Sequence, residues 1–516
     1  MDTSPSKAET TPTTTTPRQM LALLGISLVL GLVFDQLFYL RIPGISWFIF
    51  VTLVIAGLVV LARLWRRPLG VQSLWLIAPL LIIAAMVGVR ASAELAFLNI
   101  VVSLFLLLLI AVQVTGKRVE QFLLVDYVKT VFTPLSFVPK FFAVLLEAFS
   151  MRLVVKHPRT GAIVKGIIMA LPALIIFGAL FASADLVFKK YLSDAFSIHV
   201  SPEVLFQTGL VLFIGAVMLG AYGFILKNRP AATHSQPPTK KIGVTEIQVM
   251  LGLINALFIV FVLVQLRYLF GGEDIIRAQG FTYADYARRG FFELIAVAVV
   301  AFLIVWAAEQ SIARNEGRLP KSFSWLSLLL NAQVLVVMVS AFQRMNLYEQ
   351  AYGFTVLRWF AHALIIGLSV LVLIFMYKIF RHRSEATFLR LALAWGIIFL
   401  VGINIANPDR FVAHQNWDRF EKTGKFDPMY VRQLSVDATP VIIKALDAKN
   451  VVVRSSVGQY LYEQSAMLKQ DAYRHWPSYH FSRQAAAKVL DQHSAVLNIY
   501  KNIQPPSVDE LRELMP

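Results

Sequence analysis

The sequence predicts an all-α, polytopic membrane protein with a small helical domain at its C-terminus. The 516 residues are 57% hydrophobic and only 15% charged, with a mean hydropathy of +0.65, whereas soluble domains are nearer a quarter charged. The apolar residues form blocks of about 20, the length of a helix that crosses some 30 Å of hydrocarbon. After Pro408 these blocks stop and shorter amphipathic patterns follow.

The membrane-spanning helices follow a polar N-terminal segment. Residues 1–19 are rich in Thr and Pro, and we expect them to be disordered. About eleven spans are predicted after them, at residues 20–40, 45–64, 71–89, 91–114, 166–187, 203–226, 244–270, 289–309, 324–347, 356–379 and 388–406. The first block is long enough to remain in the membrane, so we do not interpret it as a cleaved signal peptide.

Two connections between spans are long. Residues 115–165 mix apolar side chains with Lys140, Glu147 and Arg152, which favours a helix that lies along the cytoplasmic surface. Residues 227–243 form a Pro-rich linker. The expected segments are therefore the tail 1–19, first spans 20–114, interfacial segment 115–165, spans 166–226, cytoplasmic linker 227–243, spans 244–406 and helical domain 407–516.

Loop charge predicts the orientation of the chain. Alternate connections carry many Lys and Arg residues, and those between them carry few. Because basic loops stay in the cytoplasm, the N-terminus is predicted to be cytoplasmic and residues 407–516 extracytoplasmic. The net charge of +17 is explained in the same way, and no nucleic acid partner is expected.

Several chemistries are excluded or disfavoured by the sequence. The absence of cysteine excludes disulfides and thiolate metal sites. Neither a P-loop nor a G-x-G-x-x-G motif is present, and we expect no cofactor and no metal. Four C-terminal histidines are interpreted as isolated surface residues: His414, His475, His480 and His493.

FTYADYARRGFFEL, residues 281–294, places polar side chains directly before an apolar span. Thr282 and Asp285 have the spacing of a capping box, which predicts a helix from about Tyr283. One face of that helix would carry Tyr286, Arg289, Gly290 and Glu293. The candidate site residues here are Tyr283, Asp285, Tyr286, Arg288, Arg289, Gly290 and Glu293.

Further polar residues are predicted at the same outer end of the helices. In RMNLYEQAYGFTVLRW, residues 344–359, three side chains spaced by four share a face, and Gly353 is placed to end the helix. The candidates here are Arg344, Tyr348, Glu349, Tyr352, Gly353 and Arg358, and beyond the last span Asn407 and Asp437. The intramembrane charges Asp35, Glu94 and Asp185 also fall at outer ends.

We expect these residues to form one polar site on the outer face, with Glu293 and Arg344 within reach of each other. The alternative is that each charge is merely tolerated near the interface and that the aromatic residues form a membrane belt.

The same stretches resemble a known family. TYADYARRGFFEL, RMNLYEQAYGFTVLR, NPD with HQNWDRF, and FDPMYVRQLSVDATP are similar to signature stretches of an uncharacterised family of bacterial polytopic membrane proteins, the domain-of-unknown-function 4153/4173 group. The similarity covers about 245–445, and the first half resembles the family only in its hydrophobicity. It implies a location in the bacterial cytoplasmic membrane and the importance of the motif residues. It implies no reaction or ligand.

Three functions remain open from the sequence. The first is an envelope binding, assembly or sensing protein that contacts the bilayer and another envelope protein. The second is a transporter of a small solute or ion. The third is a membrane-embedded enzyme acting on a lipid-linked or envelope substrate, with Asp35, Glu293 or Asp437 as acid–base and Arg289 or Arg344 holding a phosphate. We favour the first because no catalytic motif is visible, and the small-molecule ligand is not identified.

Overall fold

The computed structural model describes residues 15–66, 71–150, 181, 185, 202–228, 242–270, 291–312 and 319–503. Regular structure in these ranges is helical, apart from one isolated β-bridge between Ile242 and Ile312. Nine of the described helices are long and apolar enough to cross a membrane, or ten if one bent pair forms a single span. The predicted all-α class of a multi-pass membrane protein is therefore confirmed.

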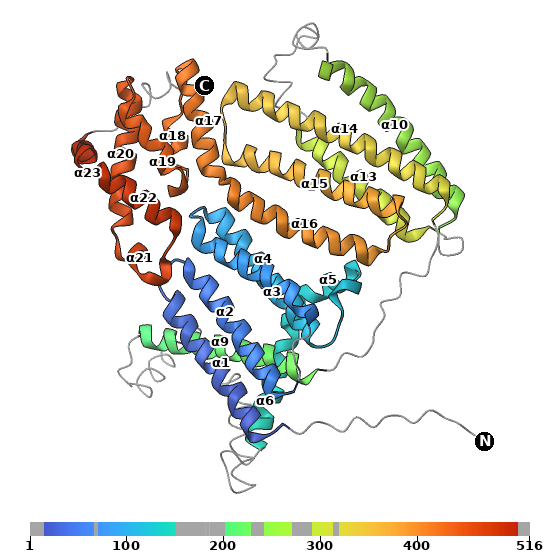
Figure 1. Cartoon of the computed structure of the whole chain (residues 1–516), viewed down its shortest axis with the longest axis vertical. Helices are drawn as coiled ribbons and strands as arrows, with labels where there is room; N and C mark the ends of the chain where they lie inside the picture. The colour runs from blue at the N-terminus through green and yellow to red at the C-terminus, as the bar shows by residue number, and fades with distance from the viewer. Residues whose placement is uncertain are drawn as a thin grey trace.

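The first bundle is built by the N-terminal half of the chain. Its helices are α1 (Pro17–Phe38), α2 (Ile45–Leu64), α3 (Val71–Val89), α4 (Ala93–Val114) and α9 (Pro202–Lys227). Neighbours in sequence pack together from α1 to α4, and α9 packs along α1 (Figure 1). At the α1–α9 contact a Cβ on Gly31 would collide with the carbonyl of Val211, so only glycine permits this close approach.

The second bundle is centred on one long helix. Its members are α10 (Val244–Phe270), α13 (Phe291–Ser311), α14 (Lys321–Tyr352), α15 (Val356–Phe380) and α16 (Glu385–Ala406). Helix α14 packs against α10, α13 and α15. Helix α16 joins the two bundles, because it packs on α15 and on α3 and places Leu400 in the core of the first bundle. Figure 1 shows α16 between α15 and α4.

A bent helical pair follows α4. Helices α5 (Leu124–Val131) and α6 (Phe137–Ser150) meet at 54°, with the short 3-10 helix η2 (Thr133–Ser136) at the bend; η1 (Val119–Gln121) precedes them. Helix α6 lies on α9, and Glu147 forms an ion pair with Lys227. A single broken span and a surface segment are both compatible with this shape, so the cytoplasmic position of residues 115–165 stays a prediction.

Helix α1 begins earlier than the sequence pattern predicted. Residues 17–19 were expected to be disordered, yet they form its first turn. The Thr16 side chain accepts a hydrogen bond from the Gln19 N–H at 3.3 Å, and the Gln19 side chain accepts one from the Thr16 N–H at 2.8 Å. This capping box and Pro17 at the first position start the helix. The predicted span 166–187 lies almost entirely outside the described residues.

The C-terminal lobe, residues 408–503, has its own core. Its helices are α17 (Pro408–Thr423), α18 (Pro428–Val431), η3 (Val436–Ala438), α19 (Thr439–Ile442), η4 (Ile443–Asp447), α20 (Val451–Leu468), α21 (Asp471–Arg474), η5 (Trp476–Ser478), α22 (Phe481–Gln492), α23 (Ser494–Leu497) and η6 (Asn498–Asn502). Val453, Val457 and Leu461 of α20 and Ala486 of α22 are fully buried in it. Asp427 caps the helix that begins at Pro428, because its side chain accepts a hydrogen bond from the N–H of Tyr430.

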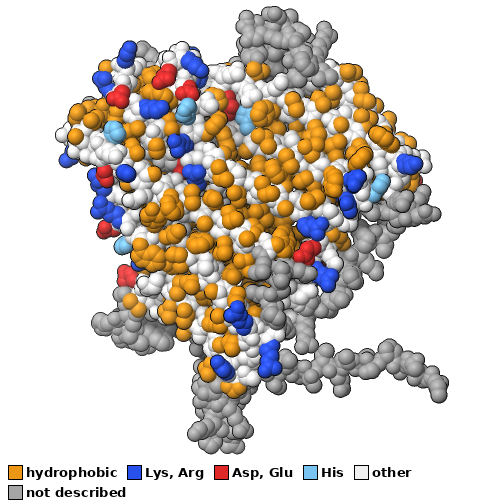
Figure 2. All heavy atoms as spheres, in the orientation of Figure 1, with side chains coloured by type: hydrophobic (Ala, Val, Ile, Leu, Met, Phe, Trp, Pro, Cys, Tyr) orange, Lys and Arg blue, Asp and Glu red, His pale blue; other side chains and the backbone are white. Residues whose placement is uncertain are grey.

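The lobe packs against one end of the membrane helices. Asn407, with a φ of 52°, turns the chain from α16 into α17, and its side chain accepts a hydrogen bond from the N–H of Arg410. Figure 2 shows a broad apolar face over the long helices, with charged side chains gathered over the C-terminal helices. An apolar face of this breadth is expected where helices contact lipid.

Candidate functional site

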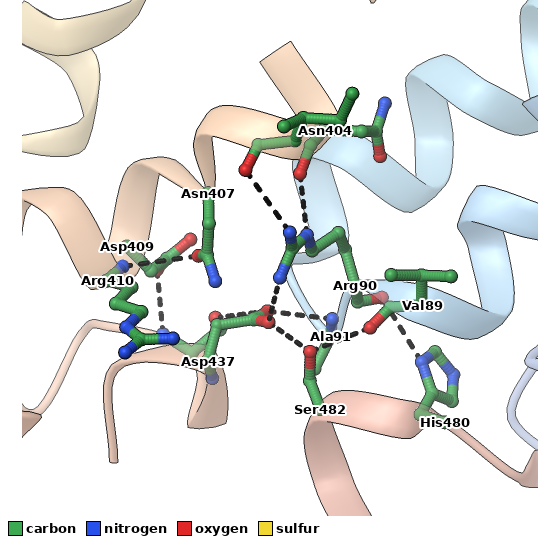
Figure 3. Close-up of polar contacts among 12 residues, drawn as sticks. Val89, Arg90, Ala91, Asn404, Asn407, Asp409, Arg410, Asp437, His480 and Ser482 are labelled. Atoms are coloured by element: carbon green, nitrogen blue, oxygen red, sulfur yellow. Dashed lines mark hydrogen bonds and ion pairs between the residues drawn. The ribbon is translucent and has the colours of Figure 1, made fainter. Parts of the chain in front are cut away.

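The turn between α3 and α4 is held by the C-terminal lobe through Arg90 (Figure 3). The guanidinium donates to the carbonyl of Asn404 at 2.6 Å and to that of Ile405 at 3.3 Å. It also lies 3.7 Å from Oδ1 of Asp437. Arg90 therefore connects the α3–α4 turn, the end of α16 and the lobe.

Asp437 is the acceptor at the centre of this contact. Its side chain is buried, and Oδ2 accepts hydrogen bonds from the N–H of Ala91 at 2.8 Å and the hydroxyl of Ser435 at 3.1 Å. The hydroxyl of Ser482 reaches both Oδ1 of Asp437 and the carbonyl of Val89. A buried carboxylate with these donors is held in one position.

His480 contacts a second turn, the one between α1 and α2 that contains Pro43. Its Nε2 lies 2.7 Å from the carbonyl of Pro43, and its Nδ1 lies 3.1 Å from that of Arg90. Burial lowers the pKa of His480 to about 4, and the positive charge of Arg483 contributes to this. The expectation of a surface histidine was wrong here, because the side chain is only 3% exposed and lies between two backbone turns.

The lobe also contacts the α14–α15 hairpin, through a different set of hydrogen bonds. The Asn416 side chain accepts from the Phe354 N–H at 2.9 Å and donates to the Phe354 carbonyl at 2.8 Å. The hydroxyl of Tyr430 accepts from the N–H of Val356 at 2.6 Å. Gly353 ends α14 as predicted, and its φ of 81° favours glycine.

A cavity of about 450 Å³ lies where the start of α4, the α14–α15 hairpin and the lobe meet. We call it the interlobe cavity. The first turn of α4 contributes Glu94, the hairpin contributes Thr355, and the lobe contributes Asp409 and Tyr430. Three segments that are far apart in the chain therefore form one space, in which the carboxylates lie among apolar wall residues such as Val356 and Phe360.

Asp409 is a buried carboxylate in the wall of this cavity. It is 4% exposed, and its Oδ1 accepts a hydrogen bond from the N–H of Ser435 at 2.8 Å. Its Oδ2 is buried and has no hydrogen-bond partner among the described residues. Burial raises the pKa of Asp409 to about 6, and the carboxylates of Asp437 and Glu94 add to the increase. A donor placed at Oδ2 would compensate this cost.

The first predicted motif is only partly described. Six of its candidates lie outside the described residues: Tyr283, Asp285, Tyr286, Arg288, Arg289 and Gly290. Glu293 is exposed in the first turn of α13, and in the described part of the chain no ion pair joins it to Arg344. Arg344 donates to Oε1 of Gln265 at 2.9 Å instead.

The second predicted motif gathers at the end of α14. The Arg358 guanidinium lies 4.2 Å from the centre of the Tyr348 ring, whose centroid is 5.0 Å from that of Tyr352. Arg358 also donates to the carbonyl of Gly353. Glu349 is buried, and its Oε2 lies 3.6 Å from Nδ1 of His362. These residues shape the hairpin that the lobe holds.

The predicted charges at helix ends have separate positions. Glu94 is exposed in the first turn of α4, where its Oε2 accepts from the hydroxyl of Ser92 at 2.7 Å. Asp35 is 7% exposed near the end of α1, within 3.3 Å of the Gln36 amide. Asp185 is exposed, and its N–H donates to the carbonyl of Phe181. Only Glu94 of the three lines the interlobe cavity.

Four residues of this region were not predicted from the sequence: Arg90, Asp409, His480 and Ser482. The sequence did mark Arg90, because it is the one basic residue in the apolar stretch 71–114. Asp409 belongs to the NPD motif. Nothing in the sequence distinguishes Ser482 from other surface serines.

The family of the chain follows from its match to known domains. A family model described as Domain of unknown function (DUF4153) matches residues 76–445. The chain belongs to the DUF4153 family. The DUF4153 match begins in α3, well before the motifs at 245–445, and so includes Arg90 as well as Asp437. No curated protein and no solved structure matches the chain.

Proposed function

We propose that this DUF4153 protein is a binding and sensing protein of the bacterial cytoplasmic membrane, with its ligand site in the interlobe cavity. The alternation of loop charge supports a cytoplasmic N-terminus and a C-terminal lobe on the outer face. The ligand we propose is a small molecule that carries an ammonium group.

The observation that carries this proposal is Oδ2 of Asp409. It is a buried carboxylate oxygen without a described hydrogen-bond partner, in a cavity whose rim carries the second carboxylate of Glu94. Arg90 does not neutralise Asp409, because its described contacts go to Asp437 and to the end of α16. An ammonium group would supply both the hydrogen-bond donors and the positive charge that this cavity needs.

The walls of the cavity indicate how binding would be sensed. Glu94 belongs to the first bundle, Thr355 to the second and Asp409 to the lobe. A ligand that contacts all three parts binds more tightly when the lobe is packed on the membrane helices than when it is not, and so favours the packed arrangement. Ligand binding in the interlobe cavity would thereby stabilise the contact between the lobe and the membrane helices. Another envelope protein could detect this change by binding to the lobe.

Thermal unfolding of the full chain in lipid nanodiscs tests this function. We expect ethanolamine or spermidine to raise the unfolding midpoint of the wild-type protein, and Asp409→Asn to abolish the increase. Glu421→Gln, an exposed carboxylate change on the same helix, is the control and should respond like the wild type. An equal increase in Asp409→Asn, or none in the wild type, would contradict the proposal.

A second candidate, transport of a small solute or ion, is favoured by buried amides between α10 and α14. The Gln333 amide donates to Oδ1 of Asn255 at 2.9 Å, and Ser340 donates to Gln265 at 2.8 Å. Buried polar groups within membrane-spanning helices line solute pathways in many transporters, although they also hold helices together. Vesicle uptake that fails in Asn255→Leu while the unfolding midpoint is unchanged would favour transport.

A further inference from the structure

A groove opens on the surface of the second bundle, between α14, α15, α16 and the first turn of α17. We call it the helix groove, and its volume is about 520 Å³. Its walls are mostly apolar, with Trp359 and Trp395 among them. Ile366, Ile398 and Phe411 are exposed along it, so it is open to the surroundings of the helices.

Two ionisable side chains interrupt this apolar lining. Glu349 is 4% exposed, and its nearest described ionic partner is Nδ1 of His362 at 3.6 Å, which is longer than a hydrogen bond. Nε2 of His362 is buried and has no hydrogen-bond partner in the described ranges. A carboxylate in apolar surroundings is costly unless a donor or a cation accompanies it.

The groove has the length of a single leaflet. Its lining follows α16 from Trp395 to Ala406, a distance of about 16 Å at 1.5 Å per residue. This is roughly half of the hydrocarbon thickness of a bilayer. Glu349 lies in the last turn of α14, at the lobe end of the groove, and Trp395 lies at the opposite end. The polar part is therefore placed at the headgroup side and the apolar part toward the bilayer centre.

We propose that the helix groove binds a single-chain amphiphile whose ammonium headgroup pairs with Glu349 and whose alkyl chain runs along α16 toward Trp395. The negative charge of Glu349 favours a cationic headgroup over an anionic one. The position of the groove on membrane-spanning helices lets such a molecule enter sideways from the bilayer. This site is separate from the interlobe cavity and does not depend on the function proposed for it.

Gly402 provides a way to block the groove without disturbing the core. It lines the groove, and a Cβ added there would meet no atom within 4 Å. Gly402→Leu should therefore fill the space in which the chain would lie. Gly396 is the matched control, because it lies on the same helix, is equally open and does not line the groove.

Photo-crosslinking of the full chain in nanodiscs tests the proposal. The probes are three diazirine-labelled dodecyl chains that end in an amine, an alcohol or a carboxylate, and the labelled residues are mapped by mass spectrometry. We expect the amine to label the groove about ten-fold more than the carboxylate, as one charge-assisted contact would produce. Glu349→Gln and Gly402→Leu should lose this labelling. Gly396→Leu and Glu246→Gln, an exposed glutamate at the start of α10, should keep it.

Three results would overturn the inference. Equal labelling by amine and carboxylate would exclude recognition by Glu349, and so would an alcohol that labels as strongly as the amine. Full labelling of Gly402→Leu would exclude the groove. The unfolding midpoint of each variant is measured alongside. If Glu349→Gln does not fold, the comparison of Gly402→Leu with Gly396→Leu still tests whether the amphiphile occupies the groove.

Discussion

Arg90, in the turn between α3 and α4, lies 3.7 Å from Asp437 of the C-terminal lobe. The same guanidinium donates to the carbonyl of Asn404 at the end of α16. One side chain thus joins the first bundle, the last span and the lobe. The first bundle and the lobe, which Arg90 joins, each contribute walls to the interlobe cavity.

Removal of the Arg90 guanidinium should loosen the lobe. Arg90→Ala leaves Asp437 buried without its cationic neighbour and removes the hydrogen bonds to the end of α16, which we expect to cost about 2 kcal/mol, since Arg90 itself is partly exposed. The unfolding midpoint in nanodiscs measures this loss. Arg410→Ala, an exposed arginine of α17, should have little effect. Arg90→Ala combined with Asp437→Asn should destabilise by less than the sum of the two single changes, and strict additivity would disprove the coupling.

The elevated pKa of Asp409 predicts a pH dependence with a defined sign. The pKa of the Asp409 carboxylate is 3.8 in the unfolded chain and rises to about 6 in the folded protein, so the folded protein binds this proton more tightly. Its contribution to stability is therefore fully present below pH 3.8 and is lost as the pH rises through 6. Asp409→Asn should remove this loss and stabilise the protein by about 3 kcal/mol at pH 7.5.

Unfolding midpoints of the wild type and Asp409→Asn across pH 4 to 7.5 test this prediction. The difference between them should grow with pH, because the variant stays neutral throughout. His480, whose folded pKa is lowered to about 4, contributes equally to both proteins, with stability that is present above pH 6.5 and lost as the pH falls through 4. A constant difference between wild type and variant would refute the role of Asp409.

A buried ion pair links α13 and α15 within the second bundle. Lys378 and Glu309 are 2% and 1% exposed, and the ammonium lies 5.4 Å from the centre of the Phe375 ring and 5.6 Å from that of Phe388. Lys378→Met should destabilise the protein by about 3–5 kcal/mol, because the charge of Glu309 loses its ammonium partner. Adding Glu309→Gln should recover most of the loss. Equal instability of the single and double variants in chemical denaturation would argue against this pair.

The proposed orientation can be tested directly because the chain has no cysteine. Lys449→Cys in the lobe and Arg383→Cys between α15 and α16 are both exposed positions. A membrane-impermeant maleimide should label the first in intact cells and the second only after lysis. The reverse pattern would place the lobe in the cytoplasm and end the proposal of an outer-face site.

Several residues of the candidate site could be predicted from the sequence, but the contacts between them could not. The sequence indicated Asp437, Asn407 and the hairpin around Gly353 through their motifs. It did not indicate that Ser482 and His480 lie beside Asp437 and Arg90, because these contacts join distant segments. The expected pairing of Glu293 with Arg344 shows the same difficulty, since helices that pack together can still direct their polar side chains to different neighbours.

By itself the sequence determined the membrane class, nine of the eleven predicted spans and many of the helix ends, whereas the apolar helix at 75–89 is shorter than the others. These properties are local: about twenty apolar residues cross the bilayer wherever they occur, and Asp427 caps a helix through its own backbone neighbours. Only the tertiary structure decided which helix ends adjoin and therefore which polar groups share a cavity. Hydropathy is nearly the same for every span, so it carries little information about which helix packs beside which, and shape-specific packing makes that choice.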